Sequence, residues 1–203
     1  MKIRVIHLGL IKTNCYMLLS DSAAIVIDPG FISDITRDFL LENNTRERMI
    51  LLTHAHFDHI GGAEALRRET GVGIGIGSID APALADTGRN LSDQFHAHIA
   101  PFEADRLFES NEKFSIGDLD ISVIFTPGHT VGGVSYLIGD CLFSGDTLFC
   151  GSVGRTDFPG GDIKALKKSV HRLAALGNDI KVYPGHGDFT LMSLEKENNM
   201  FLW

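Results

Sequence analysis

Three histidines and one aspartate stand within six residues of the sequence, at His54, His56, Asp58 and His59, directly after the apolar run 49–52. Imidazole and carboxylate groups are ligands of transition-metal ions, whereas clustering groups that are costly to bury unpaired gives a folding domain no advantage. In an extended segment His54 and His56 project the same way, and Asp58 and His59 can face a second point as the chain turns. The segment therefore predicts a loop that holds two metal ions side by side.

Three later loops each place one further candidate ligand just after a strand-like run. They are His129 in Pro-Gly-His-Thr, Asp146 in Ser-Gly-Asp-Thr, and His186 in Pro-Gly-His-Gly. Alone, each is more typical of an ordinary turn than of a metal site. Together with the cluster they supply six ligands and one carboxylate able to bridge two cations, with water in the remaining positions. We therefore predict a hydrolase with two divalent metal ions; zinc is expected, and iron or manganese suit the same ligands.

Four other histidines fall outside this pattern. His96 and His98 form a His-x-His pair within the irregular stretch 78–103, but no strand-like run precedes them and no acid follows at a useful spacing. We assign them to a lid or insertion loop without a metal role. His7 and His171 lie in regular strand-like and helix-like patterns, where packed or surface positions are expected.

A glycine-rich loop over residues 151–162 follows the Asp146 motif. Glycine allows a ligand to approach the backbone closely, and the guanidinium of Arg155 can bind a substrate carboxylate. An internal salt bridge of Arg155 is an equally weighted alternative. For Asp162 we predict a structural role, as the residue that caps the following helix.

Composition and charge limit the class of protein. The chain has 203 residues, of which 44% are hydrophobic and 22% charged, as is ordinary for one globular domain (1–203) with a sizeable core. A net charge of -8 argues against a nucleic-acid partner, whose phosphates need a basic face. No apolar run approaches the roughly 18 residues that span a membrane, and the start lacks the apolar core of a signal peptide. We therefore expect a cytoplasmic protein with no membrane partner.

The three cysteines, Cys15, Cys141 and Cys150, are an odd number without Cys-x-x-Cys spacing. This pattern suits a reducing compartment and does not suggest a thiolate metal site. We expect each of them to fill a small apolar space in the core.

Hydrophobic spacing predicts an α/β domain. Strands are expected at 2–8, 15–19, 24–27, 49–52, 72–76, 113–116, 120–125, 134–138, 141–143 and 180–183, with hairpin turns at 115–118 and 138–140. Helices are expected at 33–43, 59–69, 163–175 and 191–201. The first should begin at Ser33 and bury Ile35, Phe39 and Leu40 on one face. A layered stack in which the ligand loops leave their strands at one edge would bring the seven candidate ligands together.

Several of these motifs resemble those of the metallo-β-lactamase superfamily. The similar segments are 13–16, 27–30, 54–62, 126–130, 144–148 and 183–187. Within the superfamily the chain is most similar to glyoxalase II-like hydrolases, and residues 154–161 resemble their short, single-domain branch. The full-length glyoxalase II enzymes carry a helical C-terminal domain that helps to hold glutathione, and this chain ends soon after His186.

The resemblance implies a fold, a ligand assignment and a reaction. The fold is an αββα sandwich of two mixed β-sheets with helices on the outer faces. One metal ion belongs at His54, His56 and His129, a second at Asp58, His59 and His186, and Asp146 bridges both. The reaction is thioester hydrolysis, as in hydroxyacylglutathione hydrolase, on a small-molecule substrate.

The hypothesis for the chemistry is metal-assisted hydrolysis. Two ions roughly 3.5–4 Å apart share a hydroxide, since binding to metal can lower the pKa of water to about 7. The hydroxide attacks a thioester carbonyl that one ion polarises, and Asp58 is the catalytic residue that accepts its hydrogen bond. A thiolate with a pKa of about 8.5 leaves without a separate general acid.

Two other classes of function are alternatives for this ligand pattern. Two histidines and a carboxylate also form the facial triad of non-haem iron oxygenases, and mononuclear iron persulfide dioxygenases of the same superfamily resemble this chain. A non-catalytic or redox module is the other class. An oxygen-reducing di-iron protein would be expected to bring a flavin domain, and a nucleic-acid-processing relative would need extra domains and a basic surface, so neither fits.

Overall fold

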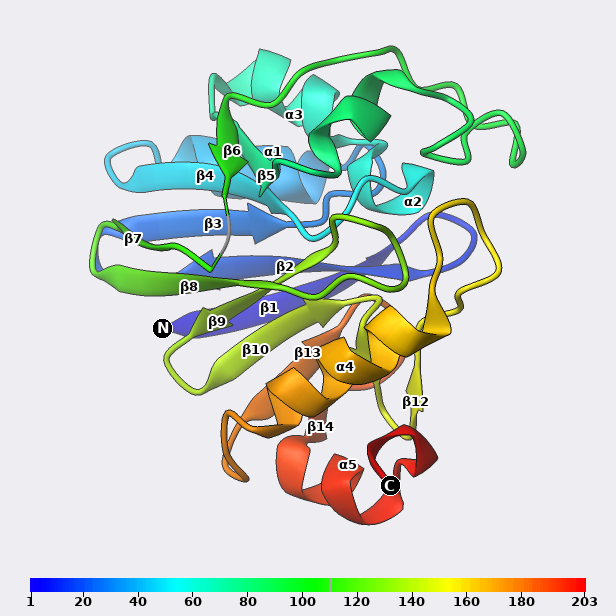
Figure 1. Ribbon diagram of the computed structural model, residues 1–203. Helices are drawn as coiled ribbons and strands as arrows, with labels where there is room; N and C mark the ends of the chain where they lie inside the picture. Colours follow the sequence, from blue (N-terminus) through cyan, green and yellow to red (C-terminus); the bar gives the residue numbers. More distant parts are fainter. Residues whose placement is uncertain (110) are drawn as a thin grey trace.

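Two six-stranded β-sheets pack face to face and carry helices on their outer sides in the computed structural model, which describes residues 1–109 and 111–203 (Figure 1). In spatial order the first sheet contains β1 (Lys2–Leu8), β2 (Thr13–Leu19), β3 (Ala23–Ile27), β4 (Glu47–Leu52), β5 (Ile74–Gly77) and β6 (Arg106–Phe108). Strands β1 to β3 are antiparallel, and β3 to β6 are parallel.

The second sheet also mixes parallel and antiparallel pairs. Its order is β14 (Thr190–Leu191), β13 (Lys181–Pro184), β10 (Cys141–Gly145), β9 (Val134–Ile138), β8 (Leu119–Phe125) and β7 (Lys113–Ile116). Strands β10 and β13 are parallel, and the other neighbours are antiparallel. A small hairpin pairs β11 (Leu148–Phe149) with β12 (Ser152–Val153).

The helices cover the outer faces of the two sheets. They are α1 (Asp34–Glu42), α2 (Phe57–Ile60), α3 (Ala63–Thr70), η1 (Ala81–Ala85), α4 (Ile163–Ala174), α5 (Met192–Asn198) and η2 (Met200–Leu202). The αββα sandwich of two mixed sheets is thus confirmed. Among the described residues, no helix combines the length and the apolar character that crossing a bilayer requires.

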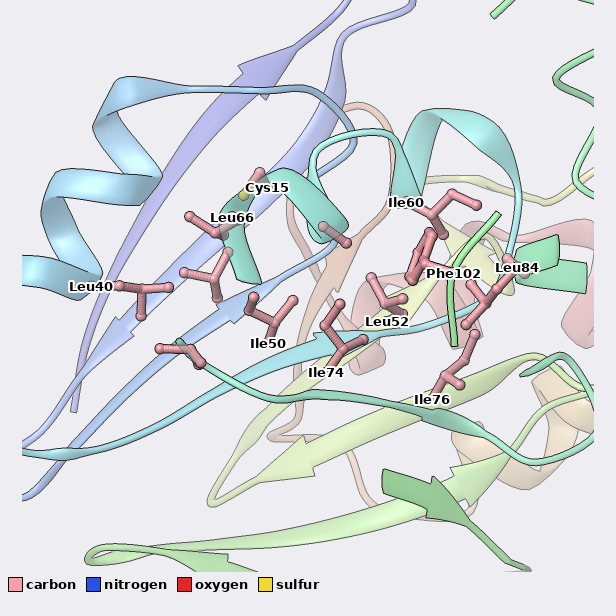
Figure 2. Packing of buried hydrophobic residues seen from close by; sticks show 14 of the residues in the cluster. Cys15, Leu40, Ile50, Leu52, Ile60, Leu66, Ile74, Ile76, Leu84 and Phe102 are labelled. Atoms are coloured by element: carbon pink, nitrogen blue, oxygen red, sulfur yellow. The ribbon is translucent and has the colours of Figure 1, made fainter. Parts of the chain in front are cut away.

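Three apolar cores hold the layers together, and the strands between them are buried on both faces. In β2, Cys15 and Met17 pack toward α1 and α3, whereas Tyr16 and Leu18 pack toward the second sheet. Figure 2 shows the outer core, where Leu40 of α1 lies among residues of the first sheet. A strand buried on both faces has a nearly continuous apolar sequence, which is why these strands were predictable.

The second outer core lies under α4. Leu166, Val170 and Leu173 of this helix pack on Leu142 and Val182 of the second sheet. The carboxylate of Asp162 accepts hydrogen bonds from the backbone N–H groups of residues 164 and 165, so the predicted helix cap is confirmed.

Some predicted elements were wrong in extent. The expected helix 59–69 is two helices, α2 and α3, because the chain turns at Gly61 and Gly62; a Cβ at either position would collide with a backbone carbonyl, that of Gly30 or Phe31. The expected helix 191–201 begins one residue later and ends as a separate 3-10 turn, η2. In α1, Leu40 is buried but Ile35 is exposed, and Ser33 makes no side-chain cap.

Four short strands were missed. They are β6, β11, β12 and β14. Two or three residues carry no readable alternation. Such strands are defined by their pairing, which for β6 is with the distant β5 and for β11 and β12 is with each other in a tight hairpin.

Candidate metal centre

The candidate ligands converge because their loops leave strands at the same edge of the sandwich. Strands β10 and β13 are parallel, so the loops that follow them, with Asp146 and His186, begin side by side. Strand β8 is antiparallel to β9, which is antiparallel to β10, so the loop with His129 starts at the same end. The backbone N–H of Val134 donates to the Thr53 carbonyl at 2.8 Å and joins the second sheet to the segment that precedes His54.

Seven side chains from these four loops meet in three overlapping groups, within each of which the ligand atoms lie no more than 4.8 Å apart. The groups are His54, His56 and His129; His54, His59 and Asp146; and Asp58, His59 and His186. The first and third groups are the two sets that the resemblance implied. The structure therefore brings every predicted ligand into one cluster.

Asp146 lies between the two sets. One carboxylate oxygen is 3.4 Å from Nε2 of His59, and the other is 3.5 Å from Nε2 of His129 and 3.6 Å from Nε2 of His186. A Cβ at Gly185 would collide with this carboxylate and with the His59 ring, so the approach depends on glycine there. Asp146 is therefore placed where a bridging carboxylate would need to be.

A hydrogen-bond chain behind the cluster orients His54 and His59. Nδ1 of His59 lies 2.8 Å from Oδ2 of Asp28, and the same oxygen accepts from the Thr53 hydroxyl at 2.7 Å. Because the Thr53 hydroxyl gives its proton to Asp28, its oxygen is left to accept from Nδ1 of His54 at 3.1 Å. In the neutral form that binds metal, both rings thus carry their N–H on Nδ1 and direct the Nε2 lone pair into the cluster.

His129 is oriented by backbone. Its Nδ1 donates to the carbonyl of Arg155 at 2.7 Å, so Nε2 faces Nδ1 of His56 at 2.9 Å. Without a metal ion, one proton between these two nitrogens makes a hydrogen bond. A bound cation would replace that proton and accept the lone pairs of both nitrogens. The glycine-rich loop that contains Arg155 therefore contributes a carbonyl to the cluster.

Asp58 and His186 are held by β2. The hydroxyl of Thr13 donates to Oδ2 of Asp58 at 2.7 Å, and the same oxygen lies 3.2 Å from Nε2 of His186. The side chains of Asn14 and Tyr16 donate to the carbonyl of Pro184 at 3.0 and 2.6 Å. The segment 13–16 is thus a brace that fixes the loop around His186.

Burial and neighbouring charges shift the pKa values of the cluster's histidines in opposite directions. Burial lowers the pKa of His54 well below its ordinary value and that of His56 to about 3, and neighbouring imidazoles add to both shifts. Burial opposes a charged His59 as well, but the surrounding carboxylates, foremost that of Asp58, hold its pKa well above the ordinary value. Burial likewise opposes ionisation of Asp146, and His59 outweighs it, so the pKa of Asp146 is lowered. His54 and His56 are therefore neutral, whereas the carboxylates around His59 stabilise a positive charge at the centre of the cluster.

Several buried polar atoms of the cluster have no hydrogen-bond partner in the described part of the chain, which bears on whether these residues can bind metal ions. Nε2 of His54, His56 and His59 and Oδ1 of Asp146 are buried and have no hydrogen-bond partner among the described residues. Buried polar atoms are normally paired, because leaving one unpaired costs about 1–3 kcal/mol. Among them, Nε2 of His59 and Oδ1 of Asp146 lie 3.4 Å apart within the cluster, and unpaired nitrogen and oxygen donors at that spacing fit divalent cations.

The remaining histidines lie apart from the three ligand groups. His96 and His98 are exposed on the loop after η1 and line a pocket with Phe31 and Phe57. His7 is exposed on β1, where its Nδ1 lies 2.7 Å from Oδ1 of Asn14, and His171 is exposed on α4. These positions agree with the packed or surface roles expected for His7 and His171.

Arg155 points along the surface near the cluster. Its side chain is 57% exposed. The guanidinium pairs with both carboxylate oxygens of Asp157 and lies 4.0 Å from the centre of the Phe158 ring. The internal salt bridge that was one of the two alternatives is thus present. Binding of a substrate by this side chain stays a prediction.

The cysteine prediction was right for two of the three residues. Cys15 and Cys141 are buried, but Cys150 is exposed where the chain turns between β11 and β12. The apolar residues around it in sequence suggested burial, but the hairpin is so short that its turn faces solvent.

Three residues that support the ligands were not predicted to belong to the site. Asp28, Thr13 and Thr53 bond directly to ligand side chains. Thr13 and Asp28 do lie in segments 13–16 and 27–30 of the family resemblance, which implied no role for either residue. The φ of Asp28, 51°, shows a backbone held in an unusual conformation.

Comparison with known proteins extends over nearly the whole chain. The family model for the metallo-β-lactamase superfamily matches residues 8–186, a range that includes all seven candidate ligands. Hydroxyacylglutathione hydrolase GloC of Haemophilus influenzae is 32% identical over 208 residues, covering 100% of this chain and 98% of that protein.

Two solved structures are similar to the fold in detail. The B3 metallo-β-lactamase BLEG-1 gives a TM-score of 0.89 at 36% identity and covers 99% of both chains. TTHA1623, in a di-iron-bound form, gives a TM-score of 0.83 at 33% identity, covering 98% of this chain and 100% of that one.

Proposed function

The chain belongs to the metallo-β-lactamase superfamily, and from that premise we propose that it is a metal-dependent hydrolase of glutathione-type thioesters with two divalent ions. The observation that carries the proposal is the cluster itself: two three-residue ligand groups, with Asp146 in contact distance of both. The relationship to GloC supports thioesters as the substrate class.

Each ligand set would hold one ion. His54, His56 and His129 would hold the first, Asp58, His59 and His186 the second, and Asp146 would contact both. Divalent ions at this position would polarise a carbonyl oxygen and make water nucleophilic near neutral pH.

Asp58 is the side chain that would orient the attacking water in the proposed hydrolysis. The residue is 7% exposed, and the Thr13 hydroxyl donates to its carboxylate, so one oxygen is fixed and the group faces the cluster. From there it can accept a hydrogen bond from the attacking water and orient its lone pair toward the substrate. A thiolate leaving group, with a pKa of about 8.5 for cysteine-like thiols, requires no proton from an acid.

Aromatic side chains shape the approach to the cluster. The rings of Phe57 and Phe95 stack with centroids 4.9 Å apart, and Phe158 lies 6.0 Å from both Phe95 and His56. This apolar wall would limit the access of bulk water and contact the apolar part of a thioester.

The test combines metal content with activity. Asp146→Ala should lose bound metal and hydrolysis of S-lactoylglutathione together, because it removes the carboxylate that contacts both sets. Asp21→Ala, at an exposed position remote from the cluster, is the matched control and should retain both. Thioester hydrolysis by Asp146→Ala free of metal would contradict the proposal.

Because the chain is similar to the β-lactamase BLEG-1, β-lactams are the second substrate class to compare. The same assay distinguishes hydrolysis of thioesters from hydrolysis of β-lactams. The metal-loaded wild type should prefer the thioester by kcat/KM. A preference for the β-lactam would assign the chain to a different substrate class.

One observation favours a second candidate, the mononuclear iron persulfide dioxygenase. His54, His59 and Asp146 form a group of two imidazoles and one carboxylate, the combination found in non-haem iron oxygenases. One iron per chain, with oxygen consumed in the presence of a persulfide, would favour this function. Two metal ions per chain and thioester hydrolysis without oxygen uptake would favour the hydrolase.

A further inference from the structure

A cavity of about 290 Å³ opens beside the metal centre, with His56 in its wall. Ala55, Ala83, Val131 and Pro159 make most of the remaining surface apolar. The volume is near the lower limit of the roughly 300–1,000 Å³ typical of small-molecule sites. The cavity therefore has the size for one substituent of a substrate whose reacting bond lies at the ligand cluster.

Two charged residues line this cavity, and one of them is already satisfied. Asp80 is 2% exposed; one of its oxygens accepts from the Thr130 hydroxyl at 2.6 Å and the other from the Gly132 backbone N–H at 2.8 Å. Its carboxylate ties the loop after His129 to the segment after β5. Asp80 is thus a structural acid, with both oxygens committed to donors of the protein.

Arg89 is the second charged residue and is free to bind a ligand. Its guanidinium donates to the Ile79 carbonyl at 3.4 Å. It makes no ion pair with a carboxylate of the described residues, although its charge acts on the Asp80 carboxylate in the same cavity and favours the ionised form of that group. Arg155, by contrast, is bound through two nitrogens to Asp157. A partly buried arginine that makes no direct ion pair, next to an apolar wall, offers its planar fork of donors to an oxyanion.

The backbone holds Arg89 at a set position relative to the metal centre. Oδ1 of Asp86 accepts from the backbone N–H of Arg89 at 3.0 Å. The next residue, Asn90, is buried; its carbonyl accepts from the N–H of Phe57 at 2.8 Å, and its side chain donates to the Ala83 carbonyl at 3.1 Å. Because Phe57 lies between His56 and Asp58, Arg89 is one residue from a direct bond to the ligand segment.

We infer that Arg89 is a specificity-determining residue that binds an anionic oxygen group, a carboxylate or phosphate, of the substrate while the thioester lies at the ligand cluster. The inference rests on the proposed thioester hydrolase. It assigns to Arg89 the anion contact that the sequence suggested for Arg155. The stretch 78–103 is accordingly part of the substrate site and supplies its cation.

Pairs of thioesters that differ by one charge test this inference. A carboxylate on the thiol half is present in S-acetyl-3-mercaptopropionate and absent from its amide. A carboxylate on the acyl half is present in S-succinyl-N-acetylcysteamine and absent from the S-butyryl compound. A phosphate on the thiol half is present in S-acetylphosphopantetheine and absent from S-acetylpantetheine. The pair that responds identifies the source of the anion.

Arg89→Ala should lower kcat/KM for the charged member of one pair by roughly 10- to 100-fold, the range expected for a lost charge-assisted hydrogen bond. The neutral member should change less than about twofold. Arg89→Lys should recover part of the loss, because it keeps the charge without the fork. Arg68→Ala, at an exposed arginine of α3, is the matched control. Metal content and thermal midpoint, measured for every variant, verify an intact centre.

Different results would contradict the role of Arg89 and the proposed thioester hydrolase function. If Arg89→Ala and the wild type treat the charged and neutral members of every pair alike, the role of Arg89 is wrong and the hydrolase stands. An equal loss on both members also overturns the anion contact. If the metal-loaded wild type hydrolyses no thioester, the proposed function is wrong and the inference falls with it.

Discussion

The backbone carbonyl of Arg155 accepts a hydrogen bond from Nδ1 of His129 at 2.7 Å. A neutral imidazole has one N–H, so this bond leaves the Nε2 lone pair of His129 directed into the ligand cluster. Asp28 acts in the same way on His59, at 2.8 Å. The protein therefore sets the direction of its candidate ligands from outside the cluster, as is usual for metal-binding histidines.

Asp28→Asn should weaken metal binding by about 10- to 100-fold, the usual effect of losing a partner behind a metal ligand. The carboxylate accepts from the Thr53 backbone, the Thr53 hydroxyl and His59, whereas an amide has a single acceptor oxygen for these three donors. Competition with a metal-binding dye measures the affinity. Asp179→Asn, on the exposed turn after α4, is the control. Unchanged affinity in Asp28→Asn would mean that His59 needs no such partner.

Zinc should raise the thermal midpoint of the metal-free protein, because a ligand that binds only the folded chain stabilises it by mass action. At 100 times Kd the gain is about 2.7 kcal/mol, or roughly 5–10 °C for a chain of this size. Thermal melts with zinc and with EDTA measure the shift. Asp146→Ala should show a much smaller one. An equal shift in that variant would place the stabilising metal elsewhere.

Glu195→Gln should lower the free energy of unfolding by about 1–3 kcal/mol. This carboxylate is 2% exposed and accepts hydrogen bonds from the Gly151 N–H, the Thr190 hydroxyl and the Asn199 amide, at 2.8–2.9 Å. An amide nitrogen in place of one oxygen would face a donor. Urea denaturation compares this variant with Glu197→Gln, an exposed position on the same helix. Equal midpoints would show that α5 is not held through Glu195.

Cys150 should react with a thiol reagent at pH 8 long before Cys15 and Cys141. It is exposed, whereas burial raises the pKa of Cys15 well above its ordinary value and that of Cys141 to about 11. Since the thiolate is the nucleophile and a raised pKa keeps the thiol protonated, the two buried groups remain unreactive until the chain unfolds. Mass spectrometry after brief labelling should find one adduct, on Cys150. Early labelling of Cys141 would contradict its burial.

Much of the ligand set was predictable from the sequence because its chemistry is local. His54 to His59 stand together after one strand, and His129, Asp146 and His186 each follow a strand-like run before a turn. The apolar strands were predictable too, since burial on both faces leaves a continuous apolar run. Helix boundaries were less so, because the break between α2 and α3 depends on how closely Gly61 and Gly62 approach the distant segment 30–31.

By itself, the sequence determined which side chains could bind metal and which segments form the layers, since both follow from residue type and short spacing. Tertiary structure decided the partners: Asp28 behind His59, the Arg155 carbonyl behind His129, and Arg89 beside the cavity at His56. The residues of these pairs are 26 to 33 positions apart, and no periodic pattern in the sequence indicates that they lie together. They arise only when the two sheets pack and bring the loops at one edge into a common site.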